Sequence, residues 1–98
     1  MAAANYHDRK ALMDRIIQVR YSNVEEEREC CYMLLEAAKQ KRDVYGIAFA
    51  YTYLGDYYIS QNDSVQCGVC LRQAQLLCVE NVYRDLMMVV HNLFGIGY

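Results

Sequence analysis

The sequence matches itself when it is moved along by 37 residues, the separation of Tyr58 from Tyr21. At this offset four pairs of identical residues coincide: Tyr21 and Tyr58, Cys30 and Cys67, Leu34 and Leu71, and Ala37 and Ala74. Each pair falls at a position that helical periodicity assigns to the inner face of a helix. An offset of 39, the separation of Leu93 from Leu54, also aligns Val90 with Tyr51 and Leu86 with Ile47. The sequence therefore predicts two similar helix pairs and a fifth helix that begins a third unit, whose second helix is missing.

Polar corners divide the chain into these helices. There is no proline, and apolar residues recur at spacings of three and four, as in Leu12, Ile16 and Val19. Residues that cap helix N-termini stand at four corners: Asn5, Asn23, Asp43 and the run Asn62-Asp63-Ser64. Together these features predict helices over residues 6–20, 24–40, 44–60, 64–78 and 82–97, and an all-α fold of about five helices.

One unit of the repeat carries a recognisable pattern. It consists of Tyr51, Leu54, Gly55, Tyr58, Cys67, Leu71 and Ala74. This spacing resembles the tetratricopeptide repeat (TPR) family, in which an aromatic residue, a Leu-Gly pair and a tyrosine on one helix meet small and large apolar residues on the next. The resemblance implies a right-handed α-solenoid of antiparallel helix pairs. It also implies that the helices approach closely at Gly55 and Ala74, which have no bulky side chains.

The sequence departs from the usual pattern of that family at several places. Val79 stands where a proline is frequent, Cys67 replaces alanine, and Gln18 occupies the position of Gly55 in the first unit. The units of 37 and 39 residues are longer than the usual 34. They resemble the long, divergent repeats of bacterial signalling and regulatory proteins. We expect a single domain over residues 1–98, with units at 6–42 and 43–81 and a partial unit at 82–98, in a fragment of a longer protein.

The resemblance implies a non-enzymatic protein-interaction module, the regulatory or input region of a larger bacterial protein. Its output domain would be, for example, a GGDEF diguanylate cyclase or a DNA-binding domain. Partner contacts in this family come from the concave face, at positions that map to Leu12, Arg15, Val19, Phe49, Thr52, Asp56, Met88 and His91. The alternative is a sensor that holds a small molecule or peptide in the same groove. Binding of chaperone tails is disfavoured, because Thr52 and Asp56 replace the cationic and amide groups of the family's carboxylate clamp.

The charge, motifs and apolar segments of the sequence argue against several other functions. The formal net charge is -2, which does not favour nucleic acid or an anionic membrane. No catalytic spacing or phosphate loop is present, so no enzyme activity and no cofactor is expected. Cys67 and Cys70 have a CxxC spacing; we interpret it as core packing, with a redox pair or half a zinc site as the less favoured alternatives. The chain lacks a long apolar segment and a secretory leader, which predicts a cytoplasmic protein with reduced cysteines.

The fifth predicted helix has an apolar face that no later helix covers. We expect it to drive self-association, as a two-fold dimer, through Leu86, Val89, Val90, Leu93 and Phe94. The tyrosines are expected to divide by position. Tyr51 and Tyr58 belong to the core, whereas Tyr45, Tyr53 and Tyr57 pack between helices or contact a partner, with packing favoured.

Overall fold

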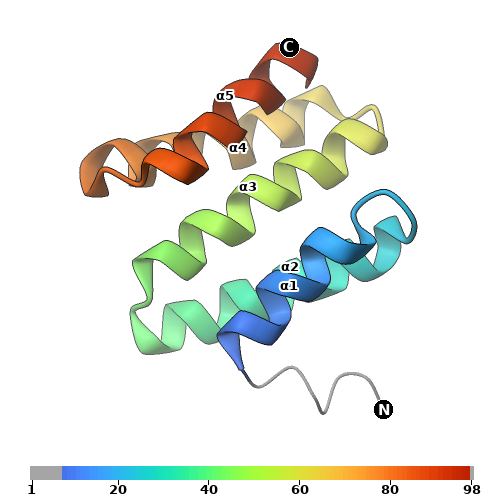
Figure 1. Cartoon of the computed structure of the whole chain (residues 1–98). Helices are drawn as coiled ribbons and strands as arrows, with labels where there is room; N and C mark the ends of the chain where they lie inside the picture. The colour runs from blue at the N-terminus through green and yellow to red at the C-terminus, as the bar shows by residue number, and fades with distance from the viewer. Residues whose placement is uncertain (1–7, 98) are drawn as a thin grey trace.

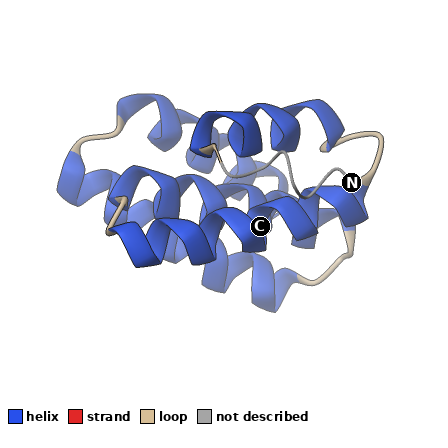
Figure 2. Cartoon of the chain, turned by 90° about the horizontal axis from the view of Figure 1, so that it is seen from below, coloured by secondary structure: helices blue, strands red, loops and turns tan. Residues whose placement is uncertain are grey.

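The structure, a computed structural model, describes residues 8–97 and contains five α-helices in that range. They are α1 (Arg9–Val19), α2 (Val24–Lys41), α3 (Val44–Ser60), α4 (Ser64–Asn81) and α5 (Arg84–Gly97). Short loops join them, and no strand occurs among the described residues (Figure 2). The all-α prediction is confirmed. The expected helices agree with the structure to within two residues at most ends. The exceptions are α1, which begins at Arg9 and not at residue 6, and α4, which continues three residues further than the predicted end at residue 78.

The helices form two layers. In Figure 1, α1, α3 and α5 run side by side in the same direction, and α2 and α4 lie behind them and run the opposite way. Helix α3 is central because it packs against all four other helices, and α1 and α5 lie on its two sides. The chain therefore makes two helical hairpins in sequence, and α5 lies beside the second of them.

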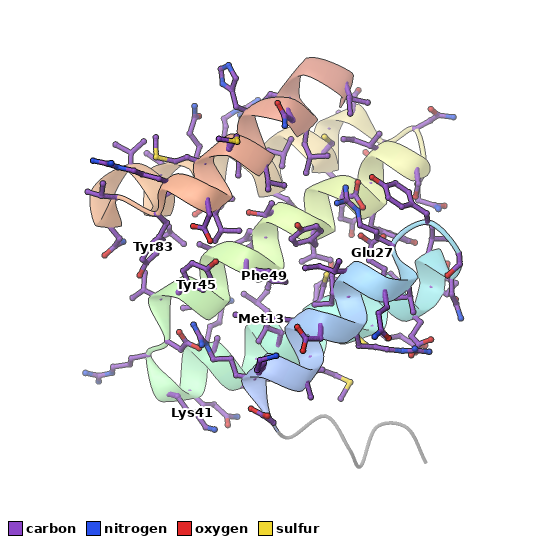
Figure 3. All side chains as sticks on the ribbon, viewed as in Figure 1. Met13, Glu27, Lys41, Tyr45, Phe49 and Tyr83 are labelled. Atoms are coloured by element: carbon purple, nitrogen blue, oxygen red, sulfur yellow. The ribbon has the colours of Figure 1, made fainter. Side chains whose placement is uncertain are left out.

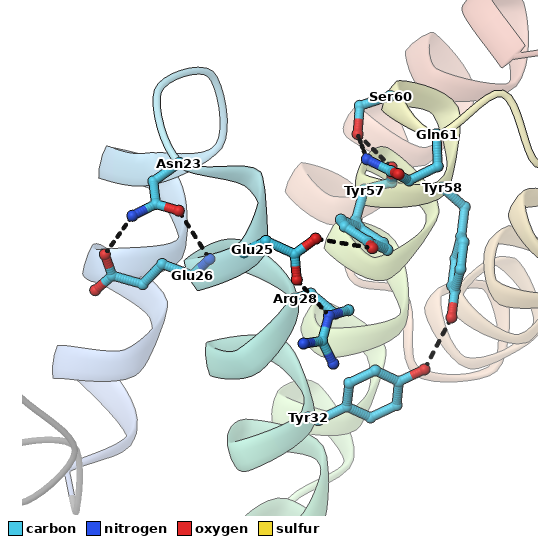
Figure 4. Close-up of polar contacts among 9 residues, drawn as sticks. All are labelled: Asn23, Glu25, Glu26, Arg28, Tyr32, Tyr57, Tyr58, Ser60 and Gln61. Atoms are coloured by element: carbon cyan, nitrogen blue, oxygen red, sulfur yellow. Dashed lines mark hydrogen bonds and ion pairs between the residues drawn. The ribbon is translucent and has the colours of Figure 1, made fainter.

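Side-chain caps begin these helices where the sequence predicts them. The carboxamide or carboxylate oxygens of Asn23, Asp43 and Asp63 accept backbone N–H groups of Glu26, Gly46 and Gln66, each at 3.1 Å. Figure 4 shows the first of these caps. For α1 the cap is Asp8, which accepts the backbone N–H of Lys10; the predicted cap Asn5 lies outside the described residues. Each cap satisfies a backbone donor that has no partner within the helix.

Gly55 explains the close packing of α3 on α4. A methyl group built at Gly55 would lie 2.7 Å from Cγ of Leu71, and the rest of its nearest surroundings is also the Leu71 side chain. The absence of a side chain at Gly55 therefore makes room for Leu71, which is fully buried. The expectation of a close approach is met, but the nearest side chain is Leu71, one turn before the predicted Ala74. Ala74 is itself fully buried in the main core.

The packing favoured for Tyr53 and Tyr57 is confirmed, but the two pairs of tyrosines differ from the prediction in how deeply they are buried. Tyr53 and Tyr57 are buried, whereas Tyr51 and Tyr58 are half-buried against the core. Figure 4 shows hydroxyl contacts of two of them with α2: Tyr58 with Tyr32 at 3.0 Å, and Tyr57 with Glu25 at 3.5 Å.

The first unit also deviates from the alignment with the second. Tyr21, aligned with Tyr58, lies in the turn after α1 and is 84% exposed. Its assignment to an inner helical face was therefore wrong. At the other end of the unit, the fully packed alanine of α2 is Ala38, while the aligned Ala37 is half-buried. The two hairpins thus share their order and direction but differ in detail where helices meet.

Helix α5 is covered on its main apolar face by the rest of the chain. Leu86, Val90 and Leu93 are each at most 3% exposed, in core clusters that include residues of α3 and α4. Val89 and Phe94 are half-buried against the same clusters. These five residues were predicted to drive self-association. They instead attach α5 to the two preceding helices, so they offer little surface to a second chain.

Candidate functional site

The eight predicted groove residues do not form one open surface. Four of them are buried: Leu12, Val19, Phe49 and Thr52. Figure 3 labels Phe49 on α3, where its ring lies 4.7 Å from that of Tyr53, and the Thr52 hydroxyl donates to the carbonyl of Ala48 at 2.8 Å. The expectation that these side chains face a partner is corrected, because the parallel packing of α1, α3 and α5 closes over them.

The other predicted residues are separated from one another. Arg15 makes a bidentate ion pair with Glu26, with N–O distances of 2.7 and 2.9 Å, which joins α1 to α2. Met88 and His91 are exposed on α5. Asp56 is part of a polar cluster beside an open pocket, and His91 lines a smaller pocket between α4 and α5.

Asp56 is ion-paired with a residue 36 positions earlier. Nη2 of Arg20 lies 2.9 Å from Oδ1 of Asp56, and Nε lies 3.2 Å from Oδ2. Both side chains are mostly buried, with 16% and 12% of their surfaces exposed. Two tyrosine rings flank the guanidinium: its carbon is 4.7 Å from the centre of Tyr21 and 5.0 Å from that of Tyr53. The bidentate geometry and the flanking rings hold Arg20 in one orientation.

Glu27 on α2 adds a fully buried carboxyl group to this cluster (Figure 3). No donor of the described residues hydrogen-bonds to either of its oxygens. Burial raises the pKa of Glu27 to about 10; the neighbouring Asp56 contributes to this rise and Arg20 opposes it. The side chain is therefore protonated at neutral pH, because a buried carboxylate without donors is much less stable than the neutral acid. Its O–H can then donate to Asp56, which gives one of the two buried oxygens a partner.

A pocket of about 190 Å³ opens next to the Arg20–Asp56 pair. It lies between the turn after α1, the C-terminal half of α3 and the C-terminal half of α5, and its lining is Arg20, Tyr21, Asp56, Ile59, Ser60, Leu93 and Ile96. We call it the ion-pair pocket. Most of its wall is apolar, and its polar members include the Arg20–Asp56 pair and Ser60.

Arg20 and Glu27 were not among the predicted site residues. Glu27 did carry a local signal, since it lies three residues before Cys30 and seven before Leu34, in line with the buried face of α2. An acidic residue on such a face has to be neutral or paired. Arg20 has no comparable signal, because its partner is supplied by a helix pairing that a single sequence does not specify.

A second feature is an exposed apolar surface on the outside of α4. Val65, Val69, Leu76 and Val79 are between 45% and 71% exposed. Their spacings of four, seven and three place them on one side of the helix. Arg72 and Glu80 are the only charged residues of α4, whereas α2, of the same length, carries eight. We call these four residues the α4 stripe.

The cysteines are buried thiols without disulfides. Burial raises the pKa of Cys70 to about 11 and also raises the pKa of Cys67, so neither thiol is activated. Within residues 8–97 no cluster of three or more side chains suited to a metal ion is found. In the same range, no helix is both long enough and apolar enough to cross a membrane.

Comparison of the chain with protein-family models, with curated proteins and with solved structures found no match in any of the three.

Proposed function

We propose that this chain is a non-enzymatic protein-interaction module that associates with a second copy of itself through the α4 stripe. The observation that carries the proposal is the stripe itself: four exposed aliphatic side chains along one helix with only two charges. Exposed apolar surfaces mark interaction sites in soluble proteins. The TPR-like pattern of residues 48–81 supports the same function by resemblance.

The chemistry of the stripe favours a second copy as the occupant. A surface of valines and a leucine requires an apolar partner helix, and α4 is such a helix. Arg72 and Glu80 leave α4 with no net charge, and Arg72, three residues after Val69 and four before Leu76, lies within the stripe. With antiparallel helices and a two-fold axis level with Ala74, Val69 of each copy lies level with Val79 of the other.

The size of the stripe sets the expected affinity. Its exposed aliphatic surface is about 400 Å² per copy, below the range of standard specific interfaces, so the dimer is expected to be weak and to dissociate in the micromolar range. Beside it, Val79 and Met87 line a small pocket of about 70 Å³ between α4 and α5. This pocket offers a place for one side chain of the second copy and extends the contact onto α5.

The resemblance to long TPR units supports a biological setting. In this proposal the module is the cytoplasmic input or regulatory region of a larger bacterial signalling protein, and self-association brings two output domains together. A GGDEF diguanylate cyclase or a DNA-binding domain is a suitable output. The alternative function, a sensor for a small molecule or peptide, is favoured by a different observation, the ion-pair pocket.

Sedimentation equilibrium between about 1 and 300 μM tests self-association. Wild-type protein is expected to change from monomer to dimer, and Leu76→Glu is expected to remain monomeric with an unchanged circular dichroism spectrum. The matched control is Ile17→Glu, which places the same charge on an exposed apolar position of α1 and should leave the dimer intact. A wild-type monomer at 300 μM, or equal weakening by both substitutions, would contradict the proposal.

A further inference from the structure

The lining of the ion-pair pocket combines apolar and polar side chains, and α3 contributes to both. Ile59 of α3 and Leu93 and Ile96 of α5 form the wall, while Arg20 and Asp56 form the polar side. Its volume of about 190 Å³ is enough for one ring-sized group, since an engineered cavity of about 150 Å³ binds benzene. The occupant is therefore a small group with an apolar body and one polar end.

The charges around the pocket determine what that polar end can be. Arg20 is neutralised by Asp56, and the neighbouring Glu27 is itself uncharged, so the polar side has no net charge. A carboxylate ligand would compete with Asp56 for the guanidinium, and an ammonium ligand would lie close to the positive charge of Arg20. A neutral polar group avoids both costs.

The donors and acceptors that remain unused at the pocket determine which neutral polar group fits there. The ion pair uses Nε and Nη2 of Arg20, and Nη1 has no hydrogen-bond partner among the described residues. The hydroxyl of Ser60 donates to the carbonyl of Tyr57 and accepts from Nε2 of Gln61 at 3.3 Å, so its oxygen has one further acceptor position. The carboxylate of Asp56 also has acceptor capacity beyond its bonds to Arg20. The pocket thus offers a donor and acceptors together, the complement of a carboxamide.

We propose that the ion-pair pocket binds a neutral carboxamide carried on an aromatic or branched aliphatic group. The carboxamide oxygen accepts from Nη1 of Arg20, and its N–H donates to Asp56 or Ser60. The ring or aliphatic body packs against Ile59, Leu93 and Ile96, and the exposed ring of Tyr21 lies at the rim. This chemistry has two sources, a free aromatic amide and the amide of an apolar residue in a peptide.

Titration of ¹⁵N-labelled protein with benzamide, followed by NMR, tests the proposal. Saturable shifts are expected at residues around the pocket, with benzoate and toluene each at least about tenfold weaker, because each lacks part of the hydrogen-bonding group. N-acetylphenylalaninamide distinguishes the sources: tighter binding than benzamide identifies a peptide, and weaker binding a free amide. Benzoate or toluene binding as tightly as benzamide, or no saturable shift with benzamide up to about 20 mM, overturns the proposal.

Two substitutions on α5 locate the binding. Ile96→Glu introduces a charge into the apolar wall at a side chain that is largely exposed, so the fold should be retained, and benzamide affinity should fall at least about tenfold. Met88→Glu makes the same change at another exposed position of α5 outside the pocket and should leave affinity unchanged. Unchanged affinity in Ile96→Glu places any binding elsewhere and overturns the proposal. The pocket and its test do not involve the α4 stripe. A failure of amide binding would therefore leave dimerisation untouched, and a failure of dimerisation would leave amide binding untouched.

Discussion

The substitution Glu27→Gln replaces a carboxyl group that is protonated in the folded protein with a neutral amide. In the unfolded chain a glutamate has a pKa near 4.3, whereas burial raises the pKa of Glu27 to about 10 in the folded protein. At pH 7 the folded state keeps a proton that the unfolded state releases. Holding it costs about 1.4 kcal/mol for each pH unit above 4.3, or about 3–4 kcal/mol at pH 7.

The sign of the pH dependence follows from this raised pKa. The stability that Glu27 contributes is fully present below about pH 4.3 and is lost steadily as the pH rises toward about 10. Glutamine is neutral at every pH, and its amide N–H can donate to Asp56 as the protonated acid does. Glu27→Gln is therefore expected to be more stable than wild type at pH 7, by up to about 3 kcal/mol.

Urea unfolding of both proteins between pH 5.5 and 8.5 measures the effect. The free-energy difference should favour the variant increasingly, by about 1.4 kcal/mol per pH unit. The matched control is Glu25→Gln, in the same first turn of α2, where the exposed carboxylate pairs with Arg28 at 3.1 Å; its effect should stay below about 1 kcal/mol at every pH. A difference between Glu27→Gln and wild type that does not change with pH would show that Glu27 is ionised in the folded protein, and would refute the reasoning.

Three further predictions concern packing and backbone strain. Gly55→Ala should destabilise the protein by about 1–2 kcal/mol in urea unfolding, since crowding against Leu71 exceeds the gain in helix propensity. Gly95→Ala should stabilise it by about 0.5–1 kcal/mol, because a methyl group at Gly95 would have no atom within 4 Å. Effects of equal sign in the two variants would contradict the close approach of Gly55 and Leu71. Val82 ends α4 with φ 56°, a conformation costly for a β-branched residue, so Val82→Gly should raise stability by about 1 kcal/mol, and a loss would contradict the strain. The five buried thiols should react with Ellman's reagent only at the rate of unfolding, and rapid labelling of folded protein would show an accessible cysteine.

Local features of the fold could be predicted from the sequence because they depend on neighbouring residues. The spacing of apolar residues gave the five helices, and Asn23, Asp43 and Asp63 act as the caps that their positions indicate. Gly55 was also correctly associated with a close approach of two helices. Each of these inferences needs only the helical period and the chemistry of one residue.

Features that depend on how the helices are assembled could not be predicted. The apolar face of α5 was taken as uncovered because no later helix follows, yet α3 and α4 bury Leu86 and Val90. The groove assignment failed for Phe49 in the same way, because adjacent helices of the front layer close over it. The ion pair of Arg20 with Asp56 joins positions 36 residues apart and has no local signal.

The most direct test of the central claim, that the α4 stripe is where two copies meet, is hydrogen–deuterium exchange at two protein concentrations. Mass spectrometry of peptides should show slower exchange at about 200 μM than at about 2 μM. The account predicts that this slowing is confined to peptides from residues 64–81 and the adjoining start of α5. Exchange that is independent of concentration, or slowing confined to α1 and α2, would contradict it.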